Sequence, residues 1–200
     1  MRKIKLSLCC VFAGTLLLGC AFITARAEQK AISEKLIRLH VIANSDSDED
    51  QSVKLMVRDA VIELLDEKSW TSVEEAQSWI SSHLSLLQDT AEKTLVRAGN
   101  DNSVKVSLTR EEYPTRDYDS FSLPAGEYWS LKIVIGQGQG KNWWCVVYPS
   151  LCRKASGAME TVAVSAGFTR DEVQFITEDT IPIKIKFKIL EIFKKFRLFS

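Results

Sequence analysis

The sequence has few of the residues on which most catalytic and metal-binding sites depend. It contains only two histidines, of which His40 lies within a predicted strand and His83 on the apolar side of a predicted helix. No zinc-ligand spacing, Ser-His-Asp ordering or paired-carboxylate pattern is present. We therefore expect no catalytic residue, no metal and no cofactor, and both histidines are predicted to be core or boundary residues.

Two stretches look like ligand-binding loops but lack the residues that such loops need. Asn44, Asp46, Asp48 and Asp50 alternate as in a calcium loop, yet neither register places glycine at position 6 or glutamate at position 12. The glycines at 136, 138 and 140 lack the spacing of a dinucleotide loop or a P-loop. We expect the first stretch to be an exposed recognition turn, in which Asp48 or Asp50 caps the next helix. We expect the second stretch to be a hairpin loop.

Cysteine is scarce beyond the first 20 residues, where only Cys145 and Cys152 occur. In an exported domain, two cysteines are most simply one disulfide, which over so short a loop stabilises by roughly 2–3 kcal/mol. Free thiols are one alternative. A cysteine nucleophile is another, and it would need a histidine nearby in space.

Positive charge is scarce in the body of the chain and concentrated at its end. Residues 28–182 hold 16 basic and 25 acidic residues, a net charge of −9, whereas residues 183–200 carry +5. An acidic body argues against nucleic acid as a partner, because neutralising phosphates takes a basic face. The basic, amphipathic tail can lie on an anionic membrane surface or pack on its own domain.

The N-terminus has the three parts of a secretion signal: a basic start, an uncharged apolar run over 6–23, and an A-x-A cleavage site at Ala25 and Ala27. Cleavage there would make Glu28 the first residue of the exported chain. Two alternatives stay open. Cys20 ends a lipobox-like stretch, and the apolar run has roughly the 20 residues that span a bilayer. All three interpretations place the domain outside the cytoplasm.

Hydrophobic periodicity predicts an α+β fold: a small antiparallel or mixed sheet packed against two helices, with a basic amphipathic C-terminal helix. The predicted units are a signal (1–27), a domain (28–152), a loop or linker (153–182) with a short helix near 170–175, and a tail (183–200). Within the domain, alternation predicts strands and three- to four-residue steps predict helices. The strands cover 36–43, 104–109, 128–135 and 143–148, and the helices cover 51–65 and 72–99.

Three stretches of the chain together resemble one protein family. The matching segments are 36–59, which includes Leu36–Asp46 and Asp50–Asp59; 113–128, with Tyr113-Pro114-Thr115 and Leu123–Tyr128; and 138–152, with Gly138–Pro149 and Leu151-Cys152. This combination is similar to stage II sporulation protein R of endospore-forming bacteria. The resemblance covers roughly 30–152 and extends loosely to the tail.

The resemblance implies a signalling role rather than catalysis. Members of the family are secreted from the forespore into the space between its membrane and the mother cell, where they activate a membrane-embedded aspartic protease that processes the sigma-E precursor. The partner contacts are expected on the exposed groups of the matching segments. These are Asn44, Asp46, Gln51, Lys54 and Arg58, together with Trp143 or Trp144 if either faces solvent.

Two other functions remain open at this point. One is a secreted hydrolase that uses Cys145 or a serine side chain. The other is a cell-envelope binding module that uses a tryptophan as a stacking platform. Since neighbouring strand residues point to opposite faces, at most one of Trp143 and Trp144 can serve such a platform.

Overall fold

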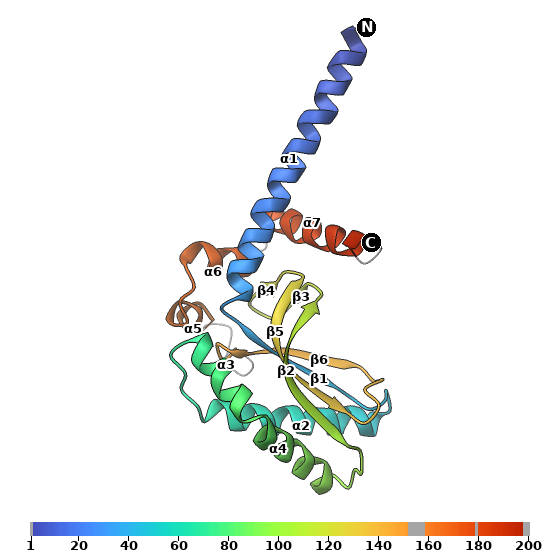
Figure 1. The fold of residues 1–200 in the computed structure, drawn as a ribbon, viewed down its shortest axis with the longest axis vertical. Helices are drawn as coiled ribbons and strands as arrows, with labels where there is room; N and C mark the ends of the chain where they lie inside the picture. The colour runs from blue at the N-terminus through green and yellow to red at the C-terminus, as the bar shows by residue number, and fades with distance from the viewer. Residues whose placement is uncertain (1, 152–158, 179, 198–200) are drawn as a thin grey trace.

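The computed structural model describes residues 2–151, 159–178 and 180–197, with side chains over 12–151, 160–178, 180 and 183–192. The predicted α+β class is confirmed (Figure 1). In chain order the elements are α1 (Arg2–Ser33), β1 (Ile37–Ile42), α2 (Asp48–Asp66), α3 (Val73–Ser82), α4 (Leu84–Arg97), β2 (Val104–Tyr113), β3 (Arg116–Asp117), β4 (Ser122–Leu123), β5 (Gly126–Ile135), β6 (Asn142–Tyr148), α5 (Met159–Ser165), α6 (Arg170–Thr177) and α7 (Ile181–Arg197).

The main sheet is mixed, with the strand order β2-β5-β1-β6. β1 pairs in parallel with β5, Leu39 facing Leu131, and antiparallel with β6, Leu39 facing Cys145. The expected hairpin between β5 and β6 is therefore wrong, because β1 lies between them. Nearly every residue of β1 is buried, which suits a central strand, and the loop over 136–141 crosses the end of β1 instead of making a tight turn.

One face of the sheet packs against α2, α3 and α4 and forms the first core (Figure 1). The expected apolar stripe of α2 supplies Val53, Val57, Val61 and Leu65, all buried. Ser47 caps α2 by accepting a hydrogen bond from the Asp50 amide at 3.2 Å. The cap is therefore one residue before Asp48, and α2 begins ahead of the predicted start at residue 51.

The predicted single helix over 72–99 is two helices that meet at His83. At the break the Ser82 hydroxyl donates to the Ser78 and Trp79 carbonyls. The His83 ring stacks on Trp79 with centroids 4.2 Å apart. Gly99, at φ 68°, ends α4 as expected.

The opposite face of the sheet carries a second core that includes the C-terminal part of the chain. Ala163, Phe168, Val173 and Phe175 are buried there beside residues of α1, β4 and β5. The stretch 153–182, expected to be a loop or linker, thus contributes α5 and α6 to the packed structure. The tail is helical as predicted, with Phe187 buried on this core and Ile185 exposed.

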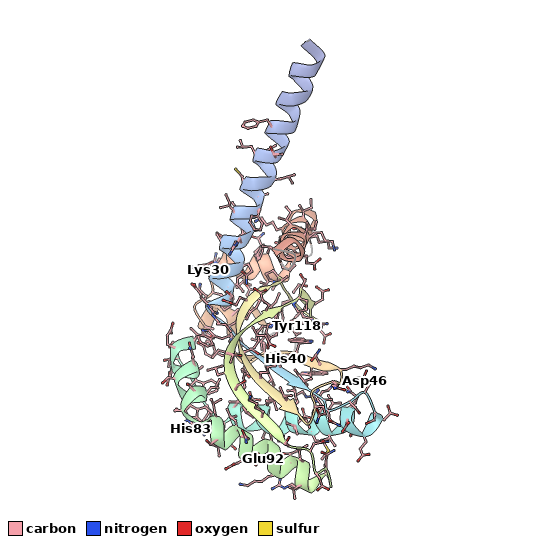
Figure 2. The ribbon with its side chains drawn as sticks, turned by 45° about the vertical axis from the view of Figure 1, so that its right-hand side comes forward. Lys30, His40, Asp46, His83, Glu92 and Tyr118 are labelled. Carbon is pink, nitrogen blue, oxygen red and sulfur yellow. The ribbon has the colours of Figure 1, made fainter. Side chains whose placement is uncertain are left out.

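α1 continues through the predicted cleavage site and projects from the rest of the chain (Figures 1 and 2). Phe12 and Leu17 are each 70% exposed, whereas Ala25 and Ile32 are buried. Glu28, the expected first residue after cleavage, pairs with Lys186 of α7 at 2.6 Å. Cleavage after Ala27 and lipidation at Cys20 stay predictions. Among the helices of the described residues, none combines the length and hydropathy of a membrane span.

Candidate functional site

The turn between β1 and α2, where the sequence predicted partner contacts, is closed around the carboxylate of Asp50. One oxygen of this buried group accepts from Asn44 Nδ2 at 2.9 Å and from Ser45 Oγ at 2.5 Å. The hydrogen bonds from Ser45 and Asn44 lower the pKa of Asp50 below its ordinary value. The carboxylate of Asp50 therefore lies at the centre of the turn, and it does not cap α2.

The same turn holds the loop between β5 and β6. The Asn44 side-chain oxygen accepts from the Gln137 amide at 2.9 Å, and its backbone carbonyl accepts from the Gln139 amide at 3.1 Å. Asp46 Oδ1 accepts from the Lys141 amide at 2.7 Å. These contacts satisfy backbone groups that a loop of this kind would otherwise leave unpaired.

Gln51 and Lys54 extend this network along α2. Gln51 Nε2 donates to the Ser45 carbonyl at 2.8 Å, and Lys54 Nζ donates to Gln51 Oε1 at 2.6 Å and to the Lys141 carbonyl at 3.1 Å. Lys54 is 4% exposed, and burial lowers its pKa. The predicted contacts at Asn44, Asp46, Gln51 and Lys54 therefore have internal partners that join the turn to the loop.

Asn44→Ala is expected to lower the free energy of unfolding by about 2 kcal/mol, because it leaves the Gln137 amide and one Asp50 contact without a partner. Urea denaturation of the purified full-length chain measures this change. Ser52→Ala, at an exposed position on α2, is the matched control and is expected to change stability by less than about 0.5 kcal/mol. Equal effects of the two substitutions would contradict a structural role for Asn44.

Arg58 and Trp143 lie together at the surface, on the face of the sheet that α2 covers. The guanidinium carbon of Arg58 lies 4.2 Å from the centroid of the Trp143 ring, and Arg58 Nε donates to Asp59 at 2.8 Å. Trp143 is 38% exposed. Of the seven predicted contacts, Arg58 and Trp143 are the two that place a charged group against an aromatic ring that solvent can reach.

Trp144 lies on the opposite face from Trp143, as the strand alternation predicted. Its ring stacks on His40 with centroids 3.7 Å apart, and it meets Tyr113 edge-on at 4.7 Å. The Arg116 guanidinium lies 5.4 Å from the same ring. The indole Nε1 is buried without a hydrogen-bond partner. Trp144 therefore connects the edge of the sheet to a polar cluster on this face.

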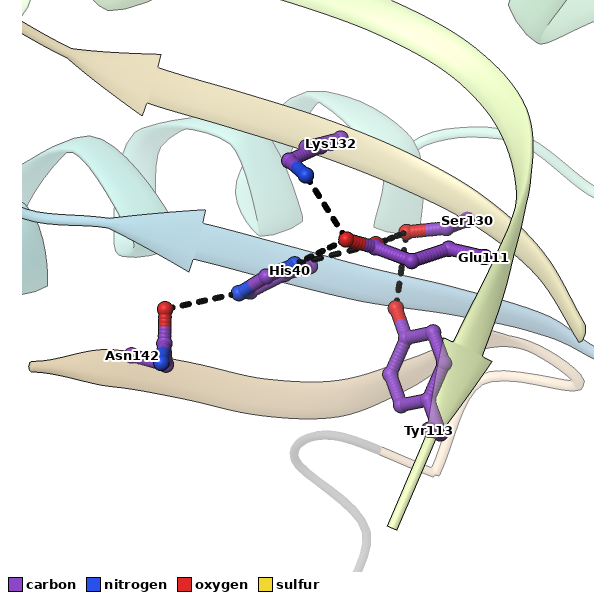
Figure 3. Close-up of polar contacts among 6 residues, drawn as sticks. All are labelled: His40, Glu111, Tyr113, Ser130, Lys132 and Asn142. Atoms are coloured by element: carbon purple, nitrogen blue, oxygen red, sulfur yellow. Dashed lines mark hydrogen bonds and ion pairs between the residues drawn. The ribbon is translucent and has the colours of Figure 1, made fainter. Parts of the chain in front are cut away.

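The polar cluster centres on Glu111, whose carboxylate is held by three side chains (Figure 3). His40 Nδ1 lies 2.9 Å from Oε2, Ser130 Oγ donates to Oε2 at 2.8 Å, and Lys132 Nζ donates to Oε1 at 2.7 Å. Burial alone would raise the pKa of Glu111, but the hydrogen bonds from His40, Lys132 and Ser130 outweigh it and lower the pKa to about 2.

The order of contacts in this cluster differs from that of a nucleophilic triad. The two ring nitrogens of His40 face Glu111 and the Asn142 Oδ1, at 2.8 Å, while the Ser130 hydroxyl contacts Glu111 and Tyr113. A serine nucleophile needs its hydroxyl on the imidazole nitrogen. Cys145 belongs to the core on the other face of the sheet from His40. In this geometry His40 is not placed to act as a base for Ser130 or for Cys145.

Arg38 is a buried charged residue of this face that the sequence analysis did not single out, as it did not single out Glu111, Ser130 or Lys132. It is 0% exposed, with its guanidinium carbon 3.9 Å from the Tyr113 ring centroid and 4.9 Å from that of Tyr128. Its Nη2 donates to the Tyr118 hydroxyl at 2.7 Å, while Nε and Nη1 have no partner. Arg38 and His40 alternate with Ile37, Leu39 and Val41, so the pattern of β1 did indicate a polar face.

Within the described residues, no group of three or more His, Cys, Asp or Glu side chains is arranged to hold a metal ion. Cys145 is buried on β6. Cys152 lies outside the described residues, so the disulfide between them stays a prediction.

Comparison with known proteins gives two matches. The family model described as Stage II sporulation protein R (spore_II_R) matches residues 33–157, which include the whole main sheet. A curated relative from Bacillus subtilis (strain 168), named "Stage II sporulation protein R", is 38% identical over 158 residues, which cover 74% of this chain and 70% of that protein. No solved structure matches the chain.

Proposed function

Because this chain belongs to the stage II sporulation protein R family, we propose that it is an exported signal that passes from the forespore to the mother cell. In this proposal it activates a membrane-embedded aspartic protease, which then processes the sigma-E precursor. The observation that carries the proposal is the family match over 33–157. That range coincides with β1 to β6 and the helices between them, so the relationship extends over the folded sheet and not one motif.

The surface of the sheet region agrees better with binding than with catalysis. The polar cluster around Glu111 is closed by its own hydrogen bonds, with Glu111 itself 18% exposed at its side chain. The accessible aromatic group is Trp143. A protein that activates an enzyme needs a contact surface and no catalytic group of its own, and the arrangement on β6 meets that need.

Export of the chain is part of this proposal, because the message has to cross a membrane to reach the protease. Its support is the N-terminal segment, where Phe12, Leu16 and Leu17 are exposed rather than packed against the domain. We also propose that α7 contacts the membrane surface through its open side, which carries Ile185 and Ile192. Whether cleaved, lipidated or anchored at its N-terminus, the domain acts outside the cytoplasm.

Deletion of the gene in its sporulating host is expected to abolish processing of the sigma-E precursor, and the full-length gene is expected to restore it. Immunoblots of the precursor and its product during sporulation measure this. A complementing copy with Leu17→Arg tests export, since a charge in the apolar run blocks insertion while Leu17 contributes little to packing. Leu17→Ile is its matched control. Normal processing in the deletion strain would refute the proposal.

A further inference from the structure

β6 forms one edge of the main sheet, and its first residues leave that edge open. Among the described strands, only β1 lies beside it. Asn142 and Trp143 are exposed, whereas every residue from Cys145 to Tyr148 is buried. The far end of the edge is also used by the chain itself, because the Leu151 amide donates to the Val146 carbonyl at 3.3 Å. The accessible part of the edge is therefore Asn142–Trp144.

The two edges of the sheet differ in charge. β2, at the opposite edge, carries Lys105, Arg110, Glu111 and Glu112, whereas β6 has the sequence NWWCVVY and no charged side chain. Charges along an edge strand discourage pairing with another chain, and an uncharged edge favours it. Because β2 has this protection and β6 lacks it, β6 is the edge suited to accept an added strand.

Cationic groups surround the open segment. Arg58 lies over Trp143 on one face and Arg116 over Trp144 on the other. Lys141, directly before β6, is exposed. Two carboxylates belong to the same surroundings: Asp59 pairs with Arg58, and Asp46 accepts from the Lys141 amide. In the part of the chain that the structure describes, neither Lys141 nor Arg116 has an ion-pair partner, so positive charge exceeds negative charge here.

We propose that Asn142–Trp144 binds an extended, acidic segment of a partner protein, which adds a strand to the sheet beside β6. Backbone hydrogen bonds supply the register of the added strand, and its alternate side chains meet the Trp143 and Trp144 faces. Carboxylates on the incoming segment pair with Arg116 and Lys141. The proposal rests on the proposed function, and it specifies which surface the protease would contact and with what chemistry.

The charges also decide between two kinds of occupant. Antiparallel pairing of two β6 strands from two copies of this chain would bring Arg58, Arg116 and Lys141 of both copies to one junction. Like charges facing one another across strands are destabilising. An acidic segment from another protein meets the same cations with opposite charge, so it is the favoured occupant.

Hydrogen exchange of the full-length chain, alone and bound to the partner protease in lipid nanodiscs, tests the proposal. We expect the amides of Asn142–Trp144 that point away from β1 to exchange at least about tenfold more slowly in the complex, since an added strand protects the outward-facing edge amides. The amides of β2 are the internal control and are expected to keep their rates. Arg116→Glu is expected to weaken binding about tenfold, and Lys105→Glu, on the opposite edge, to leave it unchanged.

The outcomes separate this proposal from the proposed function. Binding with protection of 142–144 and sensitivity to Arg116→Glu supports both. Binding with unchanged exchange at 142–144, or with equal effects of the two charge reversals, overturns the β6 site and leaves the signalling function standing. Protection that also appears in the free chain as its concentration rises would identify a second copy as the occupant and overturn the proposal. If the wild-type chain does not bind the protease, the proposed function is wrong, and the proposal that a segment of the protease binds β6 is wrong as well.

Discussion

Arg38→Ala is expected to lower the free energy of unfolding by about 4 kcal/mol, whereas Arg38→Met is expected to change it by less than about 1 kcal/mol or to raise it. The two substitutions remove the same charge. They differ in volume, because alanine leaves a cavity between the Tyr113 and Tyr128 rings and methionine fills most of it. The difference between them therefore measures packing separately from charge.

The near-neutral outcome for methionine follows from the surroundings of the guanidinium. Arg38 is fully buried, and within the described residues its guanidinium donates one hydrogen bond, to the hydroxyl of Tyr118, while Nε and Nη1 have no partner there. Burial raises the pKa of Tyr113 and Tyr128, so both rings stay neutral and provide no counter-charge. Removing a charge from water costs several kcal/mol, which two cation–π contacts of about 2 kcal/mol each offset only in part.

Urea denaturation of the purified full-length variants at pH 7 measures both values, and Arg38→Lys completes the series. Lysine keeps the charge but loses the planar group that lies against the two rings, so it is expected to be less stable than the methionine variant. If methionine proves as destabilising as alanine, the guanidinium contributes net stability and the burial argument is wrong. A stable methionine variant that fails to support sigma-E processing would show that the buried charge is needed for function rather than for stability.

The sequence predicted the class of fold because local periodicity is strong in β1, α2 and β5. It did not predict where β1 inserts. The six residues between β5 and β6 suit a hairpin by length and glycine content, and nothing local distinguishes a hairpin from a loop that crosses another strand. The choice is made by tertiary packing, since β1 is buried along nearly its whole length and occupies the centre.

The C-terminal part was underestimated for a different reason. The apolar residues of α5 and α6 are few and separated by small or polar ones, so hydrophobic periodicity is weak over 153–182. A local cue was nevertheless present, because Thr169 and Glu172 form a capping box at the start of α6. The burial of Phe168 and Phe175 depends on the far side of the sheet, which the segment's own sequence does not specify.

The candidate contacts show why polarity is a poor guide to exposure. Asn44, Gln51 and Lys54 were expected to be exposed contacts because they are polar residues of a segment that resembles the family. In the structure Asn44 and Lys54 bond the backbone of the β5–β6 loop, Gln51 bonds the Ser45 carbonyl within the turn, and Lys54 is buried. Trp143 does face solvent, as expected of a contact residue, and the Arg58 side chain over its ring is 17% exposed. Whether such a polar residue is exposed or bonded internally depends on its partner in the β5–β6 loop. For Asn44 that partner lies about 90 residues away in the chain.

Glu111→Gln is expected to lower the free energy of unfolding by about 3 kcal/mol at pH 7. The substitution leaves Lys132 and His40 without the carboxylate that joins them (Figure 3). The folded-state pKa of Glu111, about 2, lies below the ordinary value of 4.5. A separation of this size corresponds to about 3 kcal/mol, at 1.36 kcal/mol for each pKa unit.

The same separation fixes the sign and range of the pH dependence. Because the folded-state pKa is the lower one, the unfolded chain takes up the proton first as the pH falls. The stabilisation from Glu111 is therefore complete above about pH 4.5 and is lost progressively towards about pH 2. Urea denaturation at several pH values between 2 and 7 is expected to show the wild-type and Glu111→Gln curves far apart at neutral pH and converging in acid.

Glu112→Gln is the matched control, since Glu112 is the next residue of β2 and is exposed. It is expected to change stability by less than about 0.5 kcal/mol and to keep the wild-type pH profile. Wild-type and Glu111→Gln curves that stay parallel down to pH 2 would show that another group carries the acid sensitivity. Convergence would instead assign it to Glu111. Because His40 also bonds Asn142, Glu111 would then stabilise the position of the residue at which the open edge of β6 begins.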